Sequence, residues 1–103
     1  MQLQQGDTVY QSVKGIPEGA KGIERKQGAV VIAEGEMTGH AHRIFDADAF
    51  LYELNGKRYL KTTKDIQVLH EEHNPITIPT GVYEIGQVRE KDWLTGMVAP
   101  VVD

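Results

Sequence analysis

The sequence predicts an all-β fold, a small single-domain barrel or sandwich of about seven to nine short antiparallel strands. Eleven glycines interrupt the 103 residues at short intervals. The segments between them favour β-branched and aromatic residues over strong helix formers. The dipeptide Asn55-Gly56 marks a tight hairpin. We therefore expect strands joined by short turns along most of residues 1–103.

The hairpin at Asn55-Gly56 is the clearest local signal. Both positions of a two-residue type I′ turn need a positive φ, which Asn and Gly accept most readily. Counting outward from the turn pairs Leu54 with Lys57, Glu53 with Arg58, Tyr52 with Tyr59 and Leu51 with Leu60. Opposite charges, two aromatic rings and two aliphatic side chains then face each other, and each pair contributes about 0.2–1 kcal/mol.

The other expected strands are residues 8–13, 21–25, 29–34, 65–71, 76–79 and 81–88. Lys26-Gln27-Gly28 predicts a tight connection, so that residues 21–25 and 29–34 pair. The apolar run at residues 29–33 predicts a central strand that is buried on both faces. Residues 90–97 are a candidate helical turn, and residues 98–103 are either a last strand or a frayed end.

Composition predicts one globular domain over residues 1–103. Eleven basic residues against fifteen acidic ones give a net charge of −4, which disfavours non-specific nucleic-acid binding and docking on an anionic membrane. The basic residues near the hairpin are interpreted as its solvated edge: Lys57, Arg58, Lys61 and Lys64. With no leader segment and no apolar run of about 18 residues, the expected location is the cytoplasm.

All four histidines fall in two short clusters, Gly39-His40-Ala41-His42-Arg43 and His70-Glu71-Glu72-His73. In a strand, His40 and His42 point to the same face because side chains alternate. Each cluster prolongs an apolar face, so we expect the two clusters to meet at one end of the core.

Converging imidazoles suit a divalent metal ion such as zinc, and the candidate ligands are His40, His42, His70 and His73. Nearby carboxylates could complete the first shell or orient the rings: Asp46, Asp48, Glu71 and Glu72. Two other interpretations remain open. The histidines could be hydrogen-bonded supports or ligand contacts, or they could be unrelated exposed side chains.

Part of the chain resembles the cupins, small β-barrels that hold a metal with an HxH motif, an acidic residue and a later histidine. Gly35 precedes His40-Ala41-His42, Asp46 stands at the acidic position, and residues 79–83 resemble the second cupin motif. Glu84 occupies the place of the final histidine, which departs from the pattern. The resemblance implies a metal-dependent enzyme with ligands at His40 and His42, and weaker ones at Asp46 and Glu84.

A second resemblance spans nearly the whole chain. The strings EGEMTGHAHRI at residues 34–44 and HEEHNPI at residues 70–76 resemble a group of short hypothetical proteins of bacteria and phage-like elements. This likeness implies a self-contained protein and supplies no mechanism.

Three functions follow as hypotheses, and the sequence does not decide whether the chain is an enzyme. The first is a non-catalytic binding or accessory module with a histidine-rich, metal-binding end. The second is a small cupin-like metal-dependent enzyme. The third is a structural protein that self-associates, for example as a homodimer, through a proline-flanked strand and an apolar tail.

Overall fold

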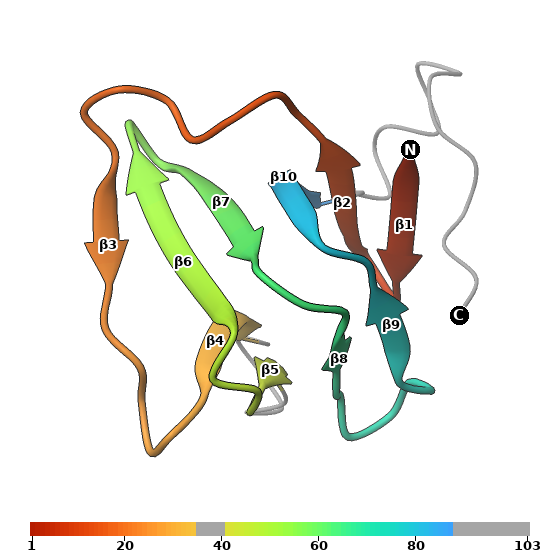
Figure 1. Ribbon diagram of the computed structural model, residues 1–103. Coiled ribbons are helices and arrows are strands. Elements are labelled where there is room, and N and C mark those ends of the chain that lie inside the picture. Colours follow the sequence, from red (N-terminus) through yellow and green to blue (C-terminus); the bar gives the residue numbers. More distant parts are fainter. Residues whose placement is uncertain (35–40, 88–103) are drawn as a thin grey trace.

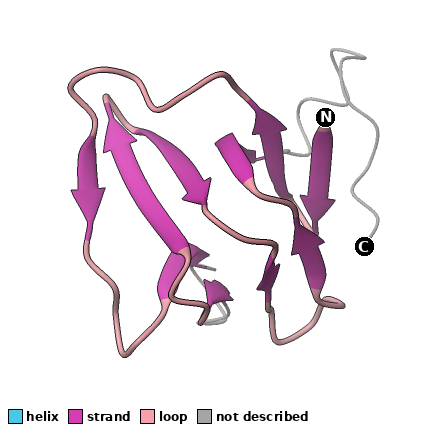
Figure 2. Cartoon of the chain, in the orientation of Figure 1, coloured by secondary structure: helices cyan, strands magenta, loops and turns pink. Residues whose placement is uncertain are grey.

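The computed structural model describes residues 1–34 and 41–87, and every regular element in these ranges is a β-strand (Figures 1 and 2). All strand pairings are antiparallel, so the predicted all-β class is confirmed. The described strands do not close into a barrel. The candidate helical turn at residues 90–97 and the tail at residues 98–103 lie outside the described residues.

Ten strands in the described residues, against the seven to nine expected, make up one large sheet and two hairpins. The strands are β1 (Gln2–Gln5), β2 (Thr8–Ser12), β3 (Lys21–Ile23), β4 (Val30–Glu34), β5 (Ala41–Ile44), β6 (Ala49–Leu54), β7 (Lys57–Thr62), β8 (Ile66–Val68), β9 (Ile76–Ile78) and β10 (Gly81–Gln87). The large sheet has the order β1-β2-β10-β7-β6-β3, whereas β4 pairs with β5 and β8 pairs with β9.

The core is shared by the large sheet and both hairpins. It is one cluster of buried side chains: Tyr10, Val30, Ile32, Ile44, Ala49, Leu51, Leu60, Ile66, Val68, Ile78 and Tyr83. An isolated bridge between Arg43 and Leu69 joins the two hairpins, with reciprocal backbone hydrogen bonds of 2.9 and 2.8 Å. Removing this apolar surface from water holds the hairpins against the sheet, at about 25 cal/mol per Å².

The hairpin formed by β6 and β7 has the predicted register. Asn55 and Gly56 have φ values of 51° and 81°, and all four predicted residue pairs are present. Arg58 reaches Glu53 across the hairpin at 3.3 Å, and Lys57 pairs with Glu84 of β10 at 3.0 Å. These two basic residues therefore have acidic partners on the surface of the sheet, where β7 lies between β10 and β6.

The predicted pairing of residues 21–25 with residues 29–34 is wrong. The tight turn exists, with Gln27 and Gly28 at φ 52° and 80°, but only Lys26 and Ala29 bridge across it. Strand β3 pairs with β6 instead. The guanidinium of Arg25 explains the divergence, because it donates to Asp46 O at 2.6 Å and Ala49 O at 3.0 Å and so holds the chain beside β6.

The run at residues 29–33 is also not a central strand. Within the described ranges β4 has one strand neighbour, β5, and Val31 is only half-buried. The pairing shifts register between Val31 and Ala33, and Arg58 donates to Val31 O at 3.4 Å and Ile32 O at 2.9 Å. A side chain therefore satisfies carbonyl groups that a second strand would otherwise bind.

The N-terminal strand β1 was not expected from the sequence, because Gln2–Gln5 contains a single aliphatic residue and no alternating pattern. It pairs with β2 so that Gln5 faces Thr8, which leaves Gly6 and Asp7 as a two-residue turn. Gly6 has φ 58°, as the first position of a type II′ turn requires.

The part of the chain that the structure describes contains no helix with the length and hydropathy needed to cross a membrane.

Candidate functional site

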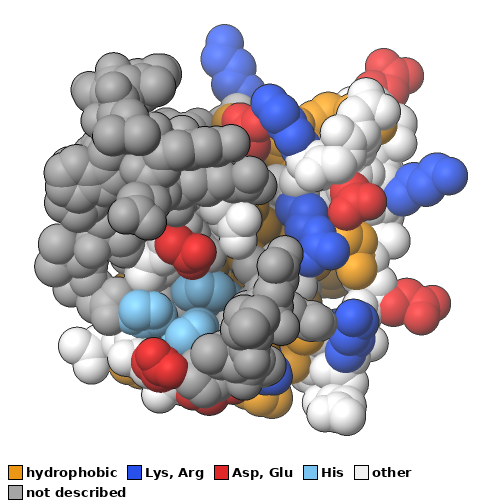
Figure 3. Space-filling view, turned by 180° about the vertical axis from the view of Figure 1, so that it is seen from behind, with side chains coloured by type: hydrophobic (Ala, Val, Ile, Leu, Met, Phe, Trp, Pro, Cys, Tyr) orange, Lys and Arg blue, Asp and Glu red, His pale blue; other side chains and the backbone are white. Residues whose placement is uncertain are grey.

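Three imidazole rings meet at one end of the molecule (Figure 3). His42 belongs to β5, and His70 and His73 lie in the bend between β8 and β9. The ring centroids of His42 and His70 are 4.5 Å apart, those of His70 and His73 are 4.4 Å apart, and those of His42 and His73 are 6.2 Å apart. His40, the fourth predicted ligand, lies outside the described residues.

The backbone explains why these rings meet. The bridge between Arg43 and Leu69 places the residue after Leu69 next to the residue before Arg43. Glu71 strengthens this link, because its carboxylate accepts a hydrogen bond from Ala41 N at 3.0 Å and one from Arg43 Nη1 at 2.8 Å. These bonds, most of all the one from Ala41 N, lower the pKa of Glu71 to about 2. Glu71, in the bend between β8 and β9, therefore forms hydrogen bonds to the residues of β5 on both sides of His42.

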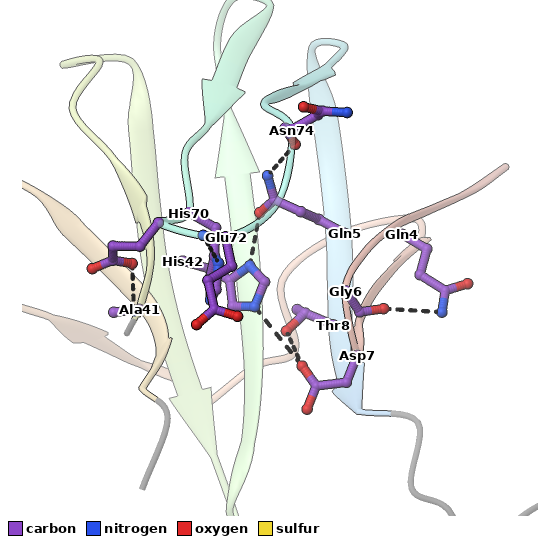
Figure 4. A network of polar contacts seen from close by, with 11 residues as sticks. Gln4, Gln5, Gly6, Asp7, Thr8, Ala41, His42, His70, Glu72 and Asn74 are labelled. Carbon is purple, nitrogen blue, oxygen red and sulfur yellow. Dashed lines mark hydrogen bonds and ion pairs between the residues drawn. The ribbon is translucent and has the colours of Figure 1, made fainter. Parts of the chain in front are cut away.

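Gln5 connects β1 to both histidine segments (Figure 4). Its buried side-chain amide donates to Val68 O and Asn74 O, each at 2.9 Å. Its Oε1 lies 2.7 Å from Nδ1 of His42. Backbone carbonyls only accept hydrogen bonds, so the two carbonyls fix which end of the amide faces His42.

His42 is only 4% exposed and is neutral at pH 7. Burial, together with the neighbouring His70 and His73, lowers its pKa from 6.5 to about 4, and the charges of Asp7 and Glu71 offset this only in part. A neutral imidazole carries one proton, and Gln5 Oε1 accepts it from Nδ1. The lone pair of His42 is consequently on Nε2.

Among the described residues, Asp7 places a carboxylate near that lone pair. Its Oδ1 lies 3.8 Å from Nε2 of His42, and its side chain is 60% exposed. This distance is too long for a hydrogen bond. A neutral Nε2 with a lone pair and a carboxylate oxygen are both acceptors, so they face each other without a proton between them.

His73 lies directly against the backbone of Gly6. A β-carbon placed on Gly6 would lie 2.5 Å from Nε2 and 2.8 Å from Cδ2 of the His73 ring. Real β-carbons do not approach other atoms so closely, so the ring occupies space that only glycine leaves open.

His70 has a fixed local contact, because its Nδ1 accepts a hydrogen bond from the backbone N–H of Glu72 at 3.0 Å. Within residues 1–34 and 41–87, no group of three or more histidine, aspartate or glutamate side chains is arranged to hold a metal ion. Ion binding therefore requires the His70 or His73 ring to turn, or a ligand from outside these ranges.

The other predicted carboxylates make contacts of a structural kind. Asp46 Oδ2 accepts from Gln67 N at 3.1 Å, and Asp48 Oδ1 accepts from Thr63 Oγ1 at 3.3 Å. Glu84, at the cupin-like position, forms its ion pair with Lys57. Glu72 contributes its backbone N–H to His70.

A groove of about 220 Å³ adjoins the cluster, and its walls are Arg43, Phe45, Leu69, His70 and Glu71. Phe45 is 56% exposed and Leu69 is 37% exposed. Apolar surface and the edge of the histidine cluster thus lie side by side.

Sequence reasoning missed Gln5, Gly6 and Asp7, which contact the cluster from the end of β1 and the turn that follows it. The one available signal was the Gly6-Asp7 dipeptide, which is typical of a tight turn. Nothing in the sequence connected that turn to residues nearly 70 positions away.

Comparison of the chain with curated proteins and with solved structures gives no match. A family model described as a domain of unknown function, DUF8820, matches residues 4–88. This range includes the turn at Gly6, both histidine clusters and all strands from β2 to β10. The chain therefore belongs to the DUF8820 family of domains of unknown function.

Proposed function

We propose that the chain is a single-domain, non-catalytic binding module whose histidine end takes up a divalent transition-metal ion such as zinc. The observation that carries the proposal is the meeting of three imidazole rings from two distant segments, with centroids 4.4 to 6.2 Å apart. Two imidazoles bound to one tetrahedral ion by bonds of ~2.0–2.1 Å have ring centroids roughly 5–5.5 Å apart. The observed separations lie within about 1 Å of that range, so a turn of the rings would let them share an ion.

The protonation of His42 supports the same proposal. Metal ions bind the lone pair of a neutral imidazole, and the pKa of about 4 keeps His42 neutral at pH 7. Its Nδ1–H is held by Gln5, which is the second contact that metal-binding histidines usually make. His70 and His73 are adjacent candidate ligands, and His40 completes the predicted set.

A binding role is favoured over a cupin-like enzyme by the contacts of the expected acidic ligands. Asp46 accepts from the backbone of Gln67, and Glu84 pairs with Lys57. Both carboxylates therefore have partners outside the histidine cluster. The groove beside His70, with the exposed Phe45 and Leu69, suits contact between the module and a larger partner at the same end.

The experiment is a metal titration of the tag-free chain, followed by thermal unfolding and calorimetry. We expect Zn²⁺ to bind and, at about 100 times its Kd, to raise Tm by roughly 10 °C. Mg²⁺ prefers oxygen ligands and serves as the control ion. His70→Gln and His73→Gln should weaken Zn²⁺ binding, whereas Lys64→Gln, at an exposed site, should not.

Two results would overturn the proposal. One is an unfolding temperature that is the same in chelator and in excess Zn²⁺. The other is a double variant His70→Gln, His73→Gln that binds Zn²⁺ as tightly as the wild-type chain.

A further inference from the structure

We infer that the turn Gln5-Gly6-Asp7 contributes to the ion site: Asp7 is a carboxylate ligand that shares the ion with Nε2 of His42, and Gln5 is the positioning residue that turns Nε2 toward it. This inference rests on the proposed function and adds two residues from a part of the chain that contains no histidine.

The first step is the orientation of the Gln5 amide. Val68 O and Asn74 O both accept from its Nε2, so a flipped amide would place its oxygen against two carbonyl oxygens. Oε1 must therefore face His42, whose Nδ1 lies 2.7 Å away and donates to it. Gln5 thus selects the Nδ1–H form of the ring and leaves the Nε2 lone pair open.

The second step is the distance between Nε2 and Asp7. Two ligand atoms on one zinc ion, with bonds of ~2.0–2.2 Å, lie about 3–4 Å apart. The separation of Nε2 of His42 and Oδ1 of Asp7 is 3.8 Å. The Nε2 lone pair and the carboxylate oxygen repel each other weakly until a cation binds between them. Binding of the cation releases no proton from His42, because the ring proton is on Nδ1.

The third step is the position of the turn. Gly6 supports the His73 ring on the same turn that carries Asp7, so the third imidazole packs against the turn that holds the proposed carboxylate. The hydrogen bond from Thr8 Oγ1 to Asp7 Oδ1, at 3.4 Å, is long and leaves the carboxylate able to bind a cation. Figure 4 shows Asp7 directed toward His42.

Two measurements test the inference separately. Long-range ¹H–¹⁵N correlation spectra of the metal-free chain report which ring nitrogen of His42 carries the proton, and we expect Nδ1. Gln5→Met should shift this equilibrium toward Nε2–H, because the acceptor is lost. Zn²⁺ affinity of Asp7→Asn should fall more than ~10-fold, whereas Glu18→Gln removes the same charge from an exposed site and should bind as the wild type does.

The outcomes separate this inference from the proposed function. Zn²⁺ binding by the wild type with equal affinities for Asp7→Asn and Glu18→Gln would overturn Asp7 as a ligand and leave the histidine site intact. An Nε2–H proton on His42 in the metal-free chain would overturn the role of Gln5 whatever the affinities are. A wild-type chain that binds no Zn²⁺ would remove both the ligand role of Asp7 and the proposed function.

Discussion

Two turns of equal length have very different surroundings in this molecule. Gly6-Asp7 joins β1 to β2, and Asn55-Gly56 joins β6 to β7, each as a two-residue connection between paired strands. Both contain a glycine with positive φ, 58° at Gly6 and 81° at Gly56. A β-carbon on Gly56 would meet nothing within 4 Å, whereas one on Gly6 would collide with the His73 ring.

The difference separates local from long-range structure. The turn at Asn55-Gly56 sets the register of its own hairpin. The turn at Gly6-Asp7 also supports an imidazole ring and presents a carboxylate to a second one. Two turns of similar local structure thus differ in their surroundings: among the described residues, one has open space beside its glycine, and the other contacts the histidine cluster through residues distant in the sequence.

The largest expected effect is that of an alanine at each glycine. Gly56→Ala should lower the free energy of unfolding by about 1 kcal/mol, which is the cost of a β-carbon in the left-handed region. Gly6→Ala should lower it by about 3 kcal/mol, because overpacking against His73 adds to the same strain. Urea unfolding of both variants checks this comparison.

The control for this comparison is the same pair of substitutions in a His73→Ala background. With the ring removed, Gly6→Ala should cost no more than Gly56→Ala. Gly22→Ala, at a position with an ordinary φ and no atom within 4 Å, gives the baseline. An unchanged cost of Gly6→Ala in the His73→Ala background would show that the ring does not fill the space beside Gly6.

The next expected effect is a loss of stability in acid at the histidine end. The pKa of His42 is about 4 in the folded chain and 6.5 as an ordinary value, so the unfolded chain binds more protons between these values. Stability is therefore full above pH 6.5 and falls as the pH is lowered toward 4. We expect His42 to account for about 1–3 kcal/mol of that fall, after allowance for solvent screening.

The pH window separates His42 from Glu71. The lowered pKa of Glu71 affects stability mainly between pH 4.5 and about 2, so a comparison of unfolding at pH 6.5 and pH 4.5 in chelator leaves out most of the Glu71 contribution. A His42→Gln variant, which cannot take up this proton, should lose less stability over the same interval. Equal losses in the variant and the wild type would assign the acid sensitivity to another group.

The sequence predicted the features of the fold that depend on neighbours in the chain. The hairpin at Asn55-Gly56 formed with its full register because the turn itself dictates which residues face each other. The turn at Gln27-Gly28 formed as well. The partner of β3 was predicted wrongly, because the contacts of Arg25 with carbonyl groups more than 20 residues away decide it.

The site was predicted in part for the same reason. Period-two alternation placed His42 and Ile44 on one face, and both are buried. The meeting of His42 with His70 depends on the bridge at Leu69, which no local pattern encodes. Gln5 lies in a strand with little apolar signal, and its three contacts span up to 69 positions. The role of Gln5 can therefore be recognised only from the three-dimensional arrangement of the strands.

The smallest expected effect comes from removing the hydroxyl group of a buried tyrosine. Tyr10 lies on β2, the strand that follows the Gly6-Asp7 turn, and Tyr83 lies on the neighbouring strand β10. The Tyr83 hydroxyl donates to Pro79 O at 2.7 Å. The Tyr10 hydroxyl is buried and has no hydrogen-bond partner within residues 1–34 and 41–87. Burial, followed by the charge of Asp7, raises the pKa of Tyr10, which keeps the hydroxyl protonated.

The same substitution should therefore have opposite effects at the two sites. Tyr83→Phe should lower the free energy of unfolding by up to about 1 kcal/mol, because Pro79 O loses the shorter of its two hydrogen bonds and keeps the one from Thr62 Oγ1 at 3.1 Å. Tyr10→Phe should leave it unchanged or raise it by up to about 1 kcal/mol, because a buried hydroxyl without a partner is removed. Urea unfolding at pH 7 in chelator measures both. An equal decrease in the free energy of unfolding for Tyr10→Phe and Tyr83→Phe would contradict this prediction, because it would mean that the Tyr10 hydroxyl makes a stabilising hydrogen bond.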